Sequence, residues 1–186
     1  MHNRVNLRSQ TTRAWLETVN CDYKRQRVNS EASLQAAYWS HLNAILLAEL
    51  PDTRRLFVEP SMRIRIKNSD GTTKPERRYP DIVVCDTKEV IGIIELKYRP
   101  KVEPNFNKDL LTFAWVAEHR NEIYVSNTRY RGDPVDPVEY KISKNLLYVW
   151  AGIHSKAKAH SAMPHINPEL KRYFHELHEV TTQSPI

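Results

Sequence analysis

The sequence is poor in cysteine, since only Cys21 and Cys85 occur among its 186 residues. Two cysteines are too few for the disulfide framework of a small secreted domain, and they show no zinc-site spacing. Cys85 lies within an apolar run, where a small buried thiol is the expected state. The cysteine content therefore argues against disulfide-rich domains and zinc modules.

Long apolar stretches are also missing. The sequence has no signal peptide, no run of about 18 apolar residues, no internal repeat and no low-complexity segment. We therefore expect a cytoplasmic protein with no membrane partner. The length of 186 residues suggests one domain with a sizeable core. Residues 1–28 would form an N-terminal helical extension of this domain, and residues 181–186 a tail.

Positive charge is in excess. The chain has 28 Lys and Arg against 22 Asp and Glu, which gives a formal net charge of +6 and a pI near 9.3. Such an excess favours a polyanionic partner such as nucleic acid. The alternative is a generally basic surface, because net charge alone does not locate a site.

Residues 79–98 predict a β-hairpin. Two runs rich in valine and isoleucine flank the polar residues Thr87-Lys88-Glu89, which is typical of two strands joined by a short loop. If these three residues form the loop, Asp86 pairs with Val90. The other residues are nearly all apolar, which indicates strands buried on both faces of a sheet.

This pairing gathers charged groups in one place. It sets Asp81 opposite Glu95, with Cβ atoms about 4.5–5.5 Å apart, and Lys97 shares the face of Glu95. Adjacent carboxylates repel, which drives one of them towards its protonated form. A divalent cation such as Mg²⁺ between them removes this conflict. The alternative is a structural ion pair of Lys97 with Asp81 or Glu95.

These residues resemble the signature of a known family. Pro80-Asp81, thirteen intervening residues and then Glu95-Leu96-Lys97 are similar to the motif of the PD-(D/E)xK, or restriction-endonuclease-like, nuclease superfamily. The resemblance covers residues 30–126. It implies an α/β fold, with a central mixed β-sheet flanked by helices as a restriction-endonuclease-like core.

The resemblance also implies an activity. A metal-dependent endonuclease of this family hydrolyses phosphodiester bonds with Mg²⁺ or Mn²⁺, and we favour DNA over RNA as its substrate. Asp81, Glu95 and the backbone carbonyl of Leu96 would hold the metal. Lys97 would orient the attacking water or stabilise charge on the phosphate. One active site cuts one strand, so a homodimer is one assembly that would cut a duplex.

Glu31 is the candidate for a third acid. Ser30 predicts the N-cap of a helix from Glu31 to Leu50. The spacing to Leu34 and Tyr38 places Glu31 at the start of the core-facing side. In the family, an acid from this helix often joins the metal ligands. The alternative is that Glu31 only complements the positive N-terminal end of the helix.

Basic residues around the hairpin are candidate nucleic-acid contacts. Apolar and cationic residues alternate over 61–67, which indicates a strand with one cationic face. The loop expected at 127–137 alternates aromatic and basic residues, a pattern that suits stacking and phosphate contacts. At each place the alternative is an exposed basic surface without a ligand. The candidates are Arg63, Arg65, Lys67, Arg77, Arg78, Arg99, Lys101, Arg129 and Arg131.

The remaining periodicities predict further elements. We expect helices over Gln10–Tyr23, Lys108–His119 and Pro168–Val180, and strands over Arg55–Glu59, Ser61–Lys67, Glu122–Ser126, Glu139–Ile142 and Leu146–Ile153. Residues 1–8 are expected to be loose and residues 68–78 to form a turn and loop. The strand at Glu122–Ser126 follows a helix, so we expect it to lie parallel to the Glu95 strand through a crossover.

Two choices stay open at this level. In the family, the helix after the Glu-x-Lys strand can present a polar group to the site, and both Lys108 and Asp109 are candidates. His175 and His178 lie three residues apart on the expected last helix, where they form either a metal pair or ordinary surface histidines.

Two other functions suit the same fold. The chain would be a non-catalytic nucleic-acid-binding module if its site does not act, or an interaction subunit of a larger nucleic-acid-processing complex. A binder without a metal site would gain no thermal stability from Mg²⁺ or Mn²⁺. Failure to bind nucleic acid at low salt, where phosphate contacts are strongest, would favour the interaction subunit.

Overall fold

Helices cover both faces of a mixed β-sheet. The structure is a computed structural model, and it describes residues 2–50, 53–67, 73–126, 139–155, 168 and 170–181. The helices are α1 (His2–Glu17), its π-helical continuation η1 (Thr18–Tyr23), α2 (Glu31–Glu49), α3 (Asn107–Glu118) and the short 3-10 helix η3 (Lys171–Tyr173). The strands are β1 (Arg55–Val58), β2 (Met62–Lys67), β3 (Thr73–Arg78), β4 (Ile82–Cys85), β5 (Glu89–Arg99), β6 (Ile123–Ser126), β7 (Glu139–Ser155) and β8 (Phe174–Thr181).

Strand β7 is the centre of the sheet. The strand order is β1-β4-β5-β7-β6-β2-β3, and β8 also pairs with β7. The pairs β5–β7 and β7–β8 are parallel, and the other pairs are antiparallel. This arrangement confirms the predicted α/β class with a central mixed sheet flanked by helices.

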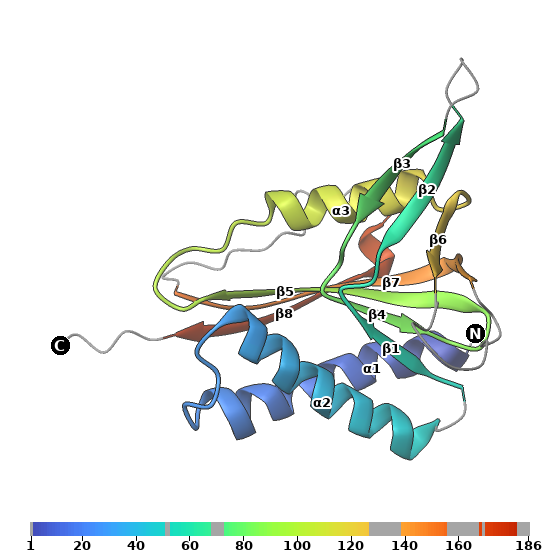
Figure 1. The fold of residues 1–186 in the computed structure, drawn as a ribbon. Coiled ribbons are helices and arrows are strands. Elements are labelled where there is room, and N and C mark those ends of the chain that lie inside the picture. Colours follow the sequence, from blue (N-terminus) through green and yellow to red (C-terminus); the bar gives the residue numbers. More distant parts are fainter. Residues whose placement is uncertain are drawn as a thin grey trace, which may run out of the picture.

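Two hydrophobic cores lie on the two faces of the sheet. Figure 1 shows α1 and α2 side by side on one face and α3 on the other. Val83, Ile93 and Phe113 belong to the core on the α3 side. Ile82 and Ile94 belong to the core on the side of α1 and α2. Successive residues of β4 and β5 thus enter opposite cores, which confirms the predicted burial of this hairpin on both faces.

Helix α2 begins where the sequence predicts. The Ser33 N–H donates to the Ser30 hydroxyl at 3.1 Å, and the Ser30 N–H donates to the Ser33 hydroxyl at 3.0 Å. This reciprocal cap satisfies free N–H groups of the first turn. Its buried stripe repeats every four residues and consists of Leu34, Tyr38, Leu42 and Leu46. The stripe packs α2 on the sheet and places Glu31 beside the end of β5.

The base of the hairpin has the predicted register. Ile82 of β4 pairs with Ile94 of β5, so continuing the ladder by one position sets Asp81 opposite Glu95. The two carboxylates therefore come from neighbouring strands at the same level of the sheet, as the pairing predicts.

The loop of the hairpin differs from the prediction. The Asp86 N–H donates to the Glu89 carbonyl at 2.9 Å, which leaves a two-residue loop instead of three. A register shift then occurs between Val84 and Cys85, where Ile91 is the extra residue of β5. The loop is one residue shorter than predicted, and the bulge adds one unpaired residue, Ile91, to β5. The two changes cancel, so the pairs beyond the bulge have the predicted register.

The predicted place of β6 in the sheet is wrong. β6 does not lie parallel to β5 but pairs antiparallel with β2 and with the start of β7. The parallel neighbour of β5 is β7, which is one continuous strand over the two predicted segments 139–142 and 146–153. The neighbours of a strand can come from distant parts of the chain. A helix between β5 and β6 therefore does not by itself make these two strands parallel neighbours.

The predicted C-terminal helix is also wrong. After η3 the chain forms β8, which runs parallel to β7. Phe174 and Leu177 are three residues apart, as on a helix face, but they enter opposite cores. In a strand, residues separated by an odd number of positions point to opposite faces. Both faces of β8 are covered by a core, so both residues are buried. For the same reason His175 and His178 lie on opposite faces of β8, which excludes the metal pair that was one of the two alternatives for them.

Two expected irregular segments are regular. α1 begins at His2 rather than at Gln10, and its Leu7, Ala14 and Trp15 are buried in the core beside α2. The expected loop before the hairpin contains β3, which pairs with β2 along its whole length. Figure 1 shows β2 and β3 extending away from the main body as a two-stranded ribbon. The predicted turn at 68–71, the loop at 127–137 and residues 182–186 of the tail lie outside the described residues.

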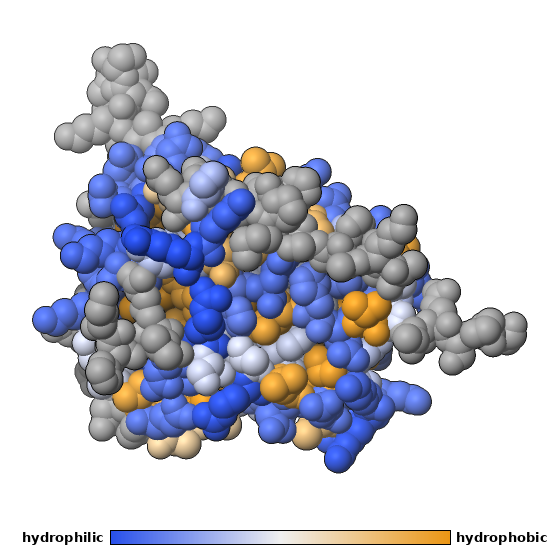
Figure 2. All heavy atoms as spheres, turned by 180° about the vertical axis from the view of Figure 1, so that it is seen from behind, coloured by the Kyte–Doolittle hydropathy of each residue, from blue (hydrophilic) through white to orange (hydrophobic). Residues whose placement is uncertain are grey.

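The surface is mostly hydrophilic where it is seen in Figure 2. On that face, hydrophobic side chains form small separate patches between larger hydrophilic areas. Among the described residues, no helix is long and apolar enough to cross a membrane.

Candidate active site

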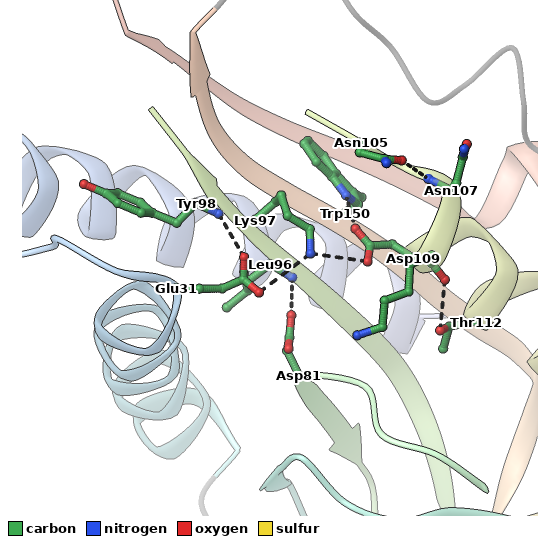
Figure 3. Close-up of polar contacts among 11 residues, drawn as sticks. Glu31, Asp81, Leu96, Lys97, Tyr98, Asn105, Asn107, Asp109, Thr112 and Trp150 are labelled. Atoms are coloured by element: carbon green, nitrogen blue, oxygen red, sulfur yellow. Dashed lines mark hydrogen bonds and ion pairs between the residues drawn. The ribbon is translucent and has the colours of Figure 1, made fainter. Parts of the chain in front are cut away.

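Charged side chains from four elements meet at the edge of the sheet where β5 ends. Asp81 directly precedes β4, and Glu95 and Lys97 lie on β5. Glu31 is the first residue of α2, and Asp109 lies in the first turn of α3. Figure 3 shows Glu31, Asp81 and Asp109 pointing towards Lys97 and its neighbour Leu96. The structure thus brings Glu31, Asp81 and Lys97 together with Asp109, one of the two candidates on α3. Glu95 belongs to the same group, since the charges of Asp81, Asp109 and Lys97 all act on it.

Asp81 is held from both its side chain and its backbone. The Leu96 N–H donates to Asp81 Oδ2 at 2.5 Å. The Asp81 carbonyl accepts hydrogen bonds from Gln35 Nε2 and from the Glu59 N–H, each at 3.0 Å. These contacts tie the carboxylate to β5, α2 and the end of β1, so its position is defined by three elements.

Lys97 forms ion pairs with two acids. Its Nζ lies 3.5 Å from Asp109 Oδ1 and 3.7 Å from Glu31 Oε1. The sequence left an ion pair of Lys97 with Asp81 or Glu95 as the alternative, whereas the ion pairs found are with Asp109 and Glu31. Burial opposes the charged ammonium, but the attraction of Asp109, Glu31, Asp81 and Glu95 outweighs it and raises the pKa of Lys97. Lys97 is therefore a cation at neutral pH.

Asp109 resolves the choice left open on α3. Its side chain is buried and Lys108 is exposed. Trp150 Nε1 donates to Asp109 Oδ2 at 2.9 Å, while Asp109 Oδ1 faces Lys97. Burial raises the pKa of Asp109, although Lys97 and the hydrogen bond from Trp150 act in the opposite direction.

Trp150 was not selected from the sequence as a residue of the site. Its indole lies over Gly152, since a Cβ on that glycine would come within 2.2 Å of the ring. The absence of a side chain at Gly152 leaves room for this ring beside β7. A tryptophan followed two residues later by glycine, in an otherwise aliphatic strand, is the local signal that could have indicated this arrangement.

Glu95 and Asp81 lie in surroundings that disfavour negative charge. Burial, reinforced by the charges of Asp81 and Asp109, raises the pKa of Glu95 to about 9. Burial also raises the pKa of Asp81 to about 6, against the hydrogen bond from Leu96. Such a pair gains from a nearby cation, because the cation favours both ionised forms.

The donor set fits a hard divalent cation. Carboxylate and carbonyl oxygens are the ligands of Mg²⁺, which usually takes one or two carboxylates and completes its shell with water and phosphate. Within the described residues, no cluster of three or more His, Cys, Asp and Glu side chains is arranged to hold a metal. A site of this chain would therefore rest on Asp81 and Glu95, since Glu31 and Asp109 already contact Lys97.

The predicted basic residues occupy different settings. Arg63 of β2 lies directly opposite Arg77 of β3. Arg78 stacks on Trp115, 5.3 Å from the ring centre, and pairs with Glu76 at 2.7 Å. The side chains of Arg65 and Lys67 and the whole of Arg129 and Arg131 lie outside the described part. Both Arg99, which ends β5, and Lys101 are exposed.

Arg77 precedes Asp81 by four residues, so the β2–β3 ribbon presents the pair of Arg63 and Arg77 next to the strand that carries Asp81 into the site. Like charges directly opposite on two strands are unfavourable without a counter-charge. Tyr79 follows this pair, is 57% exposed and is bonded by Arg77 and Ser61, which lower its pKa. Both guanidinium groups and the phenol thus belong to the base of the β2–β3 ribbon.

Comparisons with known proteins add little. No protein-family model matches the chain, and no curated protein matches it. Among solved structures it is similar to the cAAA-bound form of NucC from P. aeruginosa ATCC27853. That match has 13% sequence identity, covers 93% of this chain and 70% of the other, and has a TM-score of 0.35. A TM-score this low supports no conclusion about function, so the chain's own residues must carry it.

Proposed function

We propose that this protein is a metal-dependent nuclease that hydrolyses phosphodiester bonds, with DNA as its substrate. The observation that carries the proposal is the meeting of Asp81, Glu95 and Lys97 at one end of the hairpin. Buried carboxylates with raised pKa values and a charged lysine beside them are costly for a structural role. The same groups suit the binding of a cation and an anionic phosphate.

Asp81 and Glu95 would hold Mg²⁺ or Mn²⁺, with the backbone carbonyl of Leu96. When bound, the metal would lower the pKa of a water molecule and neutralise the scissile phosphate. Hydrolysis adds this water across the bond between phosphorus and the leaving oxygen.

Lys97 would act on the phosphate or on the water as a cation. The acids around Lys97 raise its pKa, and as a cation it is suited to stabilise charge on the phosphate oxygens. Asp109 and Glu31 position the ammonium from two sides. Asp109 is itself oriented by Trp150.

The nucleic acid would approach along the base of the β2–β3 ribbon. Arg63 and Arg77 lack a direct counter-charge across the strand pair and would bind phosphates there. Arg99 and Lys101 are exposed just beyond β5 and would extend this contact. Phosphate contacts position the substrate but do not read its sequence.

A cleavage assay tests the proposal. Plasmid, linear duplex, single-stranded DNA and RNA are offered to the purified protein with Mg²⁺, with Mn²⁺ or with EDTA. We expect cleavage that needs metal and is lost, by about 100-fold or more, in Asp81→Ala and Lys97→Ala. Glu118→Gln is the control, because this side chain is 75% exposed and lies nine residues beyond Asp109, at the other end of α3.

Three results would contradict the nuclease. They are full activity of Asp81→Ala, activity in EDTA, and no cleavage of any substrate. Salt-dependent binding of DNA without cleavage would favour the non-catalytic binding module instead. Cleavage of RNA alone would retain the nuclease and exclude DNA as its substrate. Gel filtration with and without DNA tests whether the active form is a homodimer.

A further inference from the structure

A hollow lies at the end of α3 that is opposite to Asp109. Its volume is about 620 Å³, which is in the range of about 300–1,000 Å³ typical of small-molecule sites. Ala117 near the end of α3, the segment from Lys144 to Tyr148 in β7, and η3 contribute to its walls. Ala117 is eight residues beyond Asp109 on the same helix. This separates the two places by about 12 Å along the axis.

The walls of this hollow carry positive charge. Arg120, Lys144 and Arg172 line it, and none of the described lining residues is acidic. Leu146, Leu170 and Ala117 supply an apolar part of the wall. The C-terminal end of α3 opposes an anion with only about half an elementary charge. The net field therefore favours an anionic ligand.

The positions of the cations are partly defined by the fold. Arg120 Nη1 donates to the Lys144 carbonyl at 3.2 Å, whereas its Nε is buried without a hydrogen-bond partner among the described residues. Arg172 stacks on Tyr173 with its guanidinium carbon 4.3 Å from the ring centre. Ion pairing among the described residues does not involve Lys144 or Arg172. Internal contacts thus hold the side chains of Arg120 and Arg172 without neutralising them.

A neighbouring hollow continues the positive surface. It has a volume of about 450 Å³ and shares Asn145, Arg172 and Tyr173 with the first. Arg8 lines it and donates through Nη2 to the Arg172 carbonyl at 3.2 Å. The contact joins α1 to η3, so a fourth cation stands on the far side of Arg172.

We propose that the hollow lined by Arg120, Lys144 and Arg172 binds a small phosphate-bearing molecule, such as pyrophosphate or a nucleotide. Guanidinium groups bind phosphate oxygens through paired hydrogen bonds, and lysine adds a point charge. The apolar wall would contact the part of the ligand that is not phosphate. A half-open hollow of this volume with an apolar part of its wall suits a small molecule better than a continuous strand, which needs an extended groove.

Thermal shift and calorimetry on the full chain test this site. The experiments are done at low salt in EDTA, so that no metal-dependent binding at Asp81 and Glu95 contributes. The probes are pyrophosphate, ATP, deoxyadenosine and a short single-stranded DNA. We expect pyrophosphate and ATP to stabilise the protein and deoxyadenosine to have no effect. The two phosphate probes separate binding of phosphate alone from binding of a whole nucleotide.

Charge reversal locates the binding. The variant Lys144→Glu/Arg172→Glu changes two exposed side chains and should weaken pyrophosphate and ATP by about tenfold or more. Lys88→Glu, at the exposed tip of the hairpin, is the matched control and should bind as the wild type does. If the reversal variant is unstable without ligand, Lys144→Gln/Arg172→Gln replaces it, with the same expected direction.

Four results would overturn the proposal. These are no stabilisation by either phosphate probe, equal stabilisation by deoxyadenosine, binding that survives the double variant, and binding of DNA but not of the small molecules. None of them bears on cleavage, because the assay contains no metal. Conversely, an inactive nuclease would leave this site untouched.

Discussion

At the scale of the residue, the electrostatics of Glu95 offers the most direct test of the candidate site. Its pKa rises from 4.5 to about 9, because burial and the charges of Asp81 and Asp109 disfavour the ionised form. The unfolded chain releases this proton near pH 4.5, whereas the folded chain keeps it. The contribution of Glu95 to the free energy of unfolding is therefore fully present below about pH 4.5 and decreases as the pH rises towards 9.

The variant Glu95→Gln should remove this pH dependence. Without metal, we expect the wild type to lose stability relative to the variant from about pH 5 to pH 9. A loss of one to a few kcal/mol would lower the melting temperature by about 2–4 °C for each kcal/mol. Melting curves across this pH range in EDTA measure the effect. Parallel curves for the two proteins would show that Glu95 is not in the environment described here.

A divalent metal should reverse the same effect. Because a cation favours the ionised carboxylates, Mg²⁺ or Mn²⁺ should stabilise the wild type at pH 8 and should stabilise Glu95→Gln and Asp81→Asn much less. Thermal shift against metal concentration measures this. Glu118→Gln is the control, since its exposed carboxylate should not alter the response. An unchanged response in Asp81→Asn would place any bound metal elsewhere.

Asp109 is a positioning residue in this proposal. Asp109→Asn keeps the shape of the side chain but removes the charge that faces Lys97 at 3.5 Å. We expect cleavage to fall by about 10- to 100-fold, mainly in kcat with little change in KM, because Lys97 loses one of its two fixed partners. Trp150→Phe keeps an aromatic ring but loses the 2.9 Å hydrogen bond to Asp109, and should reduce cleavage less.

A merely structural role for Asp109 would give a different pattern. It would lower the melting temperature of Asp109→Asn while leaving kcat per folded molecule unchanged. The pH profile separates the two cases further, because loss of the carboxylate should lower the pKa of Lys97 and alter the alkaline limb of kcat.

At the scale of the element, β7 carries the support of the site. Trp150 packs over Gly152, where a Cβ would meet ring atoms at 2.2, 2.8 and 2.9 Å. At Gly92 of the adjacent strand β5, a Cβ would meet the flexible end of Leu7 at 3.0 Å. The two glycines thus face different obstacles, a rigid ring and a movable methyl group.

This contrast predicts unequal effects of alanine. Gly152→Ala should destabilise the fold by about 2–3 kcal/mol and reduce cleavage, because the indole must move away from Asp109. Gly92→Ala should cost about 1 kcal/mol or less and keep cleavage, because Leu7 can adjust. Denaturant unfolding and cleavage rates of both variants measure this. Equal costs, or an active Gly152→Ala protein, would contradict the supporting role of Trp150.

Local sequence signals predicted α2 correctly, whereas the prediction for β8, which depends on long-range strand pairing, was wrong. Helix α2 followed from Ser30 and from apolar residues at helical spacing, because caps and amphipathic stripes are local. The strand β8 was expected to be part of a helix opened by Pro168, and its Phe174 and Leu177 are three residues apart, a spacing that a helix face also has. Only the presence of β7 beside it, with a core on each face, makes that spacing a strand pattern.

At the scale of the whole molecule, the net charge of +6 predicts salt-dependent binding of nucleic acid. Each phosphate contact contributes about 0.9 to the slope of log K against log salt for duplex DNA. Arg63→Ser/Arg77→Ser should therefore reduce the slope by about 2. Titrations of the two proteins at several salt concentrations measure it. Arg25→Ser, an exposed arginine far from the ribbon in sequence, is the control.

An unchanged slope in the double variant would remove the ribbon from the proposed interface. The result would leave Arg99 and Lys101 as the exposed cations nearest the end of β5. A similar reduction in Arg25→Ser would instead indicate a diffuse basic surface, which is the alternative that the sequence leaves open.

The sequence by itself determined the hairpin and its charges. Strand alternation and antiparallel pairing are short-range, so the placement of Asp81 opposite Glu95, with Lys97 nearby, follows from residues 79–98 alone. The predicted pairing is correct although the predicted loop is one residue too long, because the bulge at Ile91 restores the register. The same local rules located α2 and placed Glu31 at its start.

Only the tertiary structure decided how these charges are arranged. It selected Asp109 over Lys108, supplied Trp150 and Gly152 from β7, and gave Lys97 its partners Glu31 and Asp109. Each of these contacts joins elements far apart in the chain. Their formation depends on strand order and helix packing, which short sequence patterns do not encode. The acids and the lysine are thus specified locally, and the environment that tunes them is specified by the whole fold.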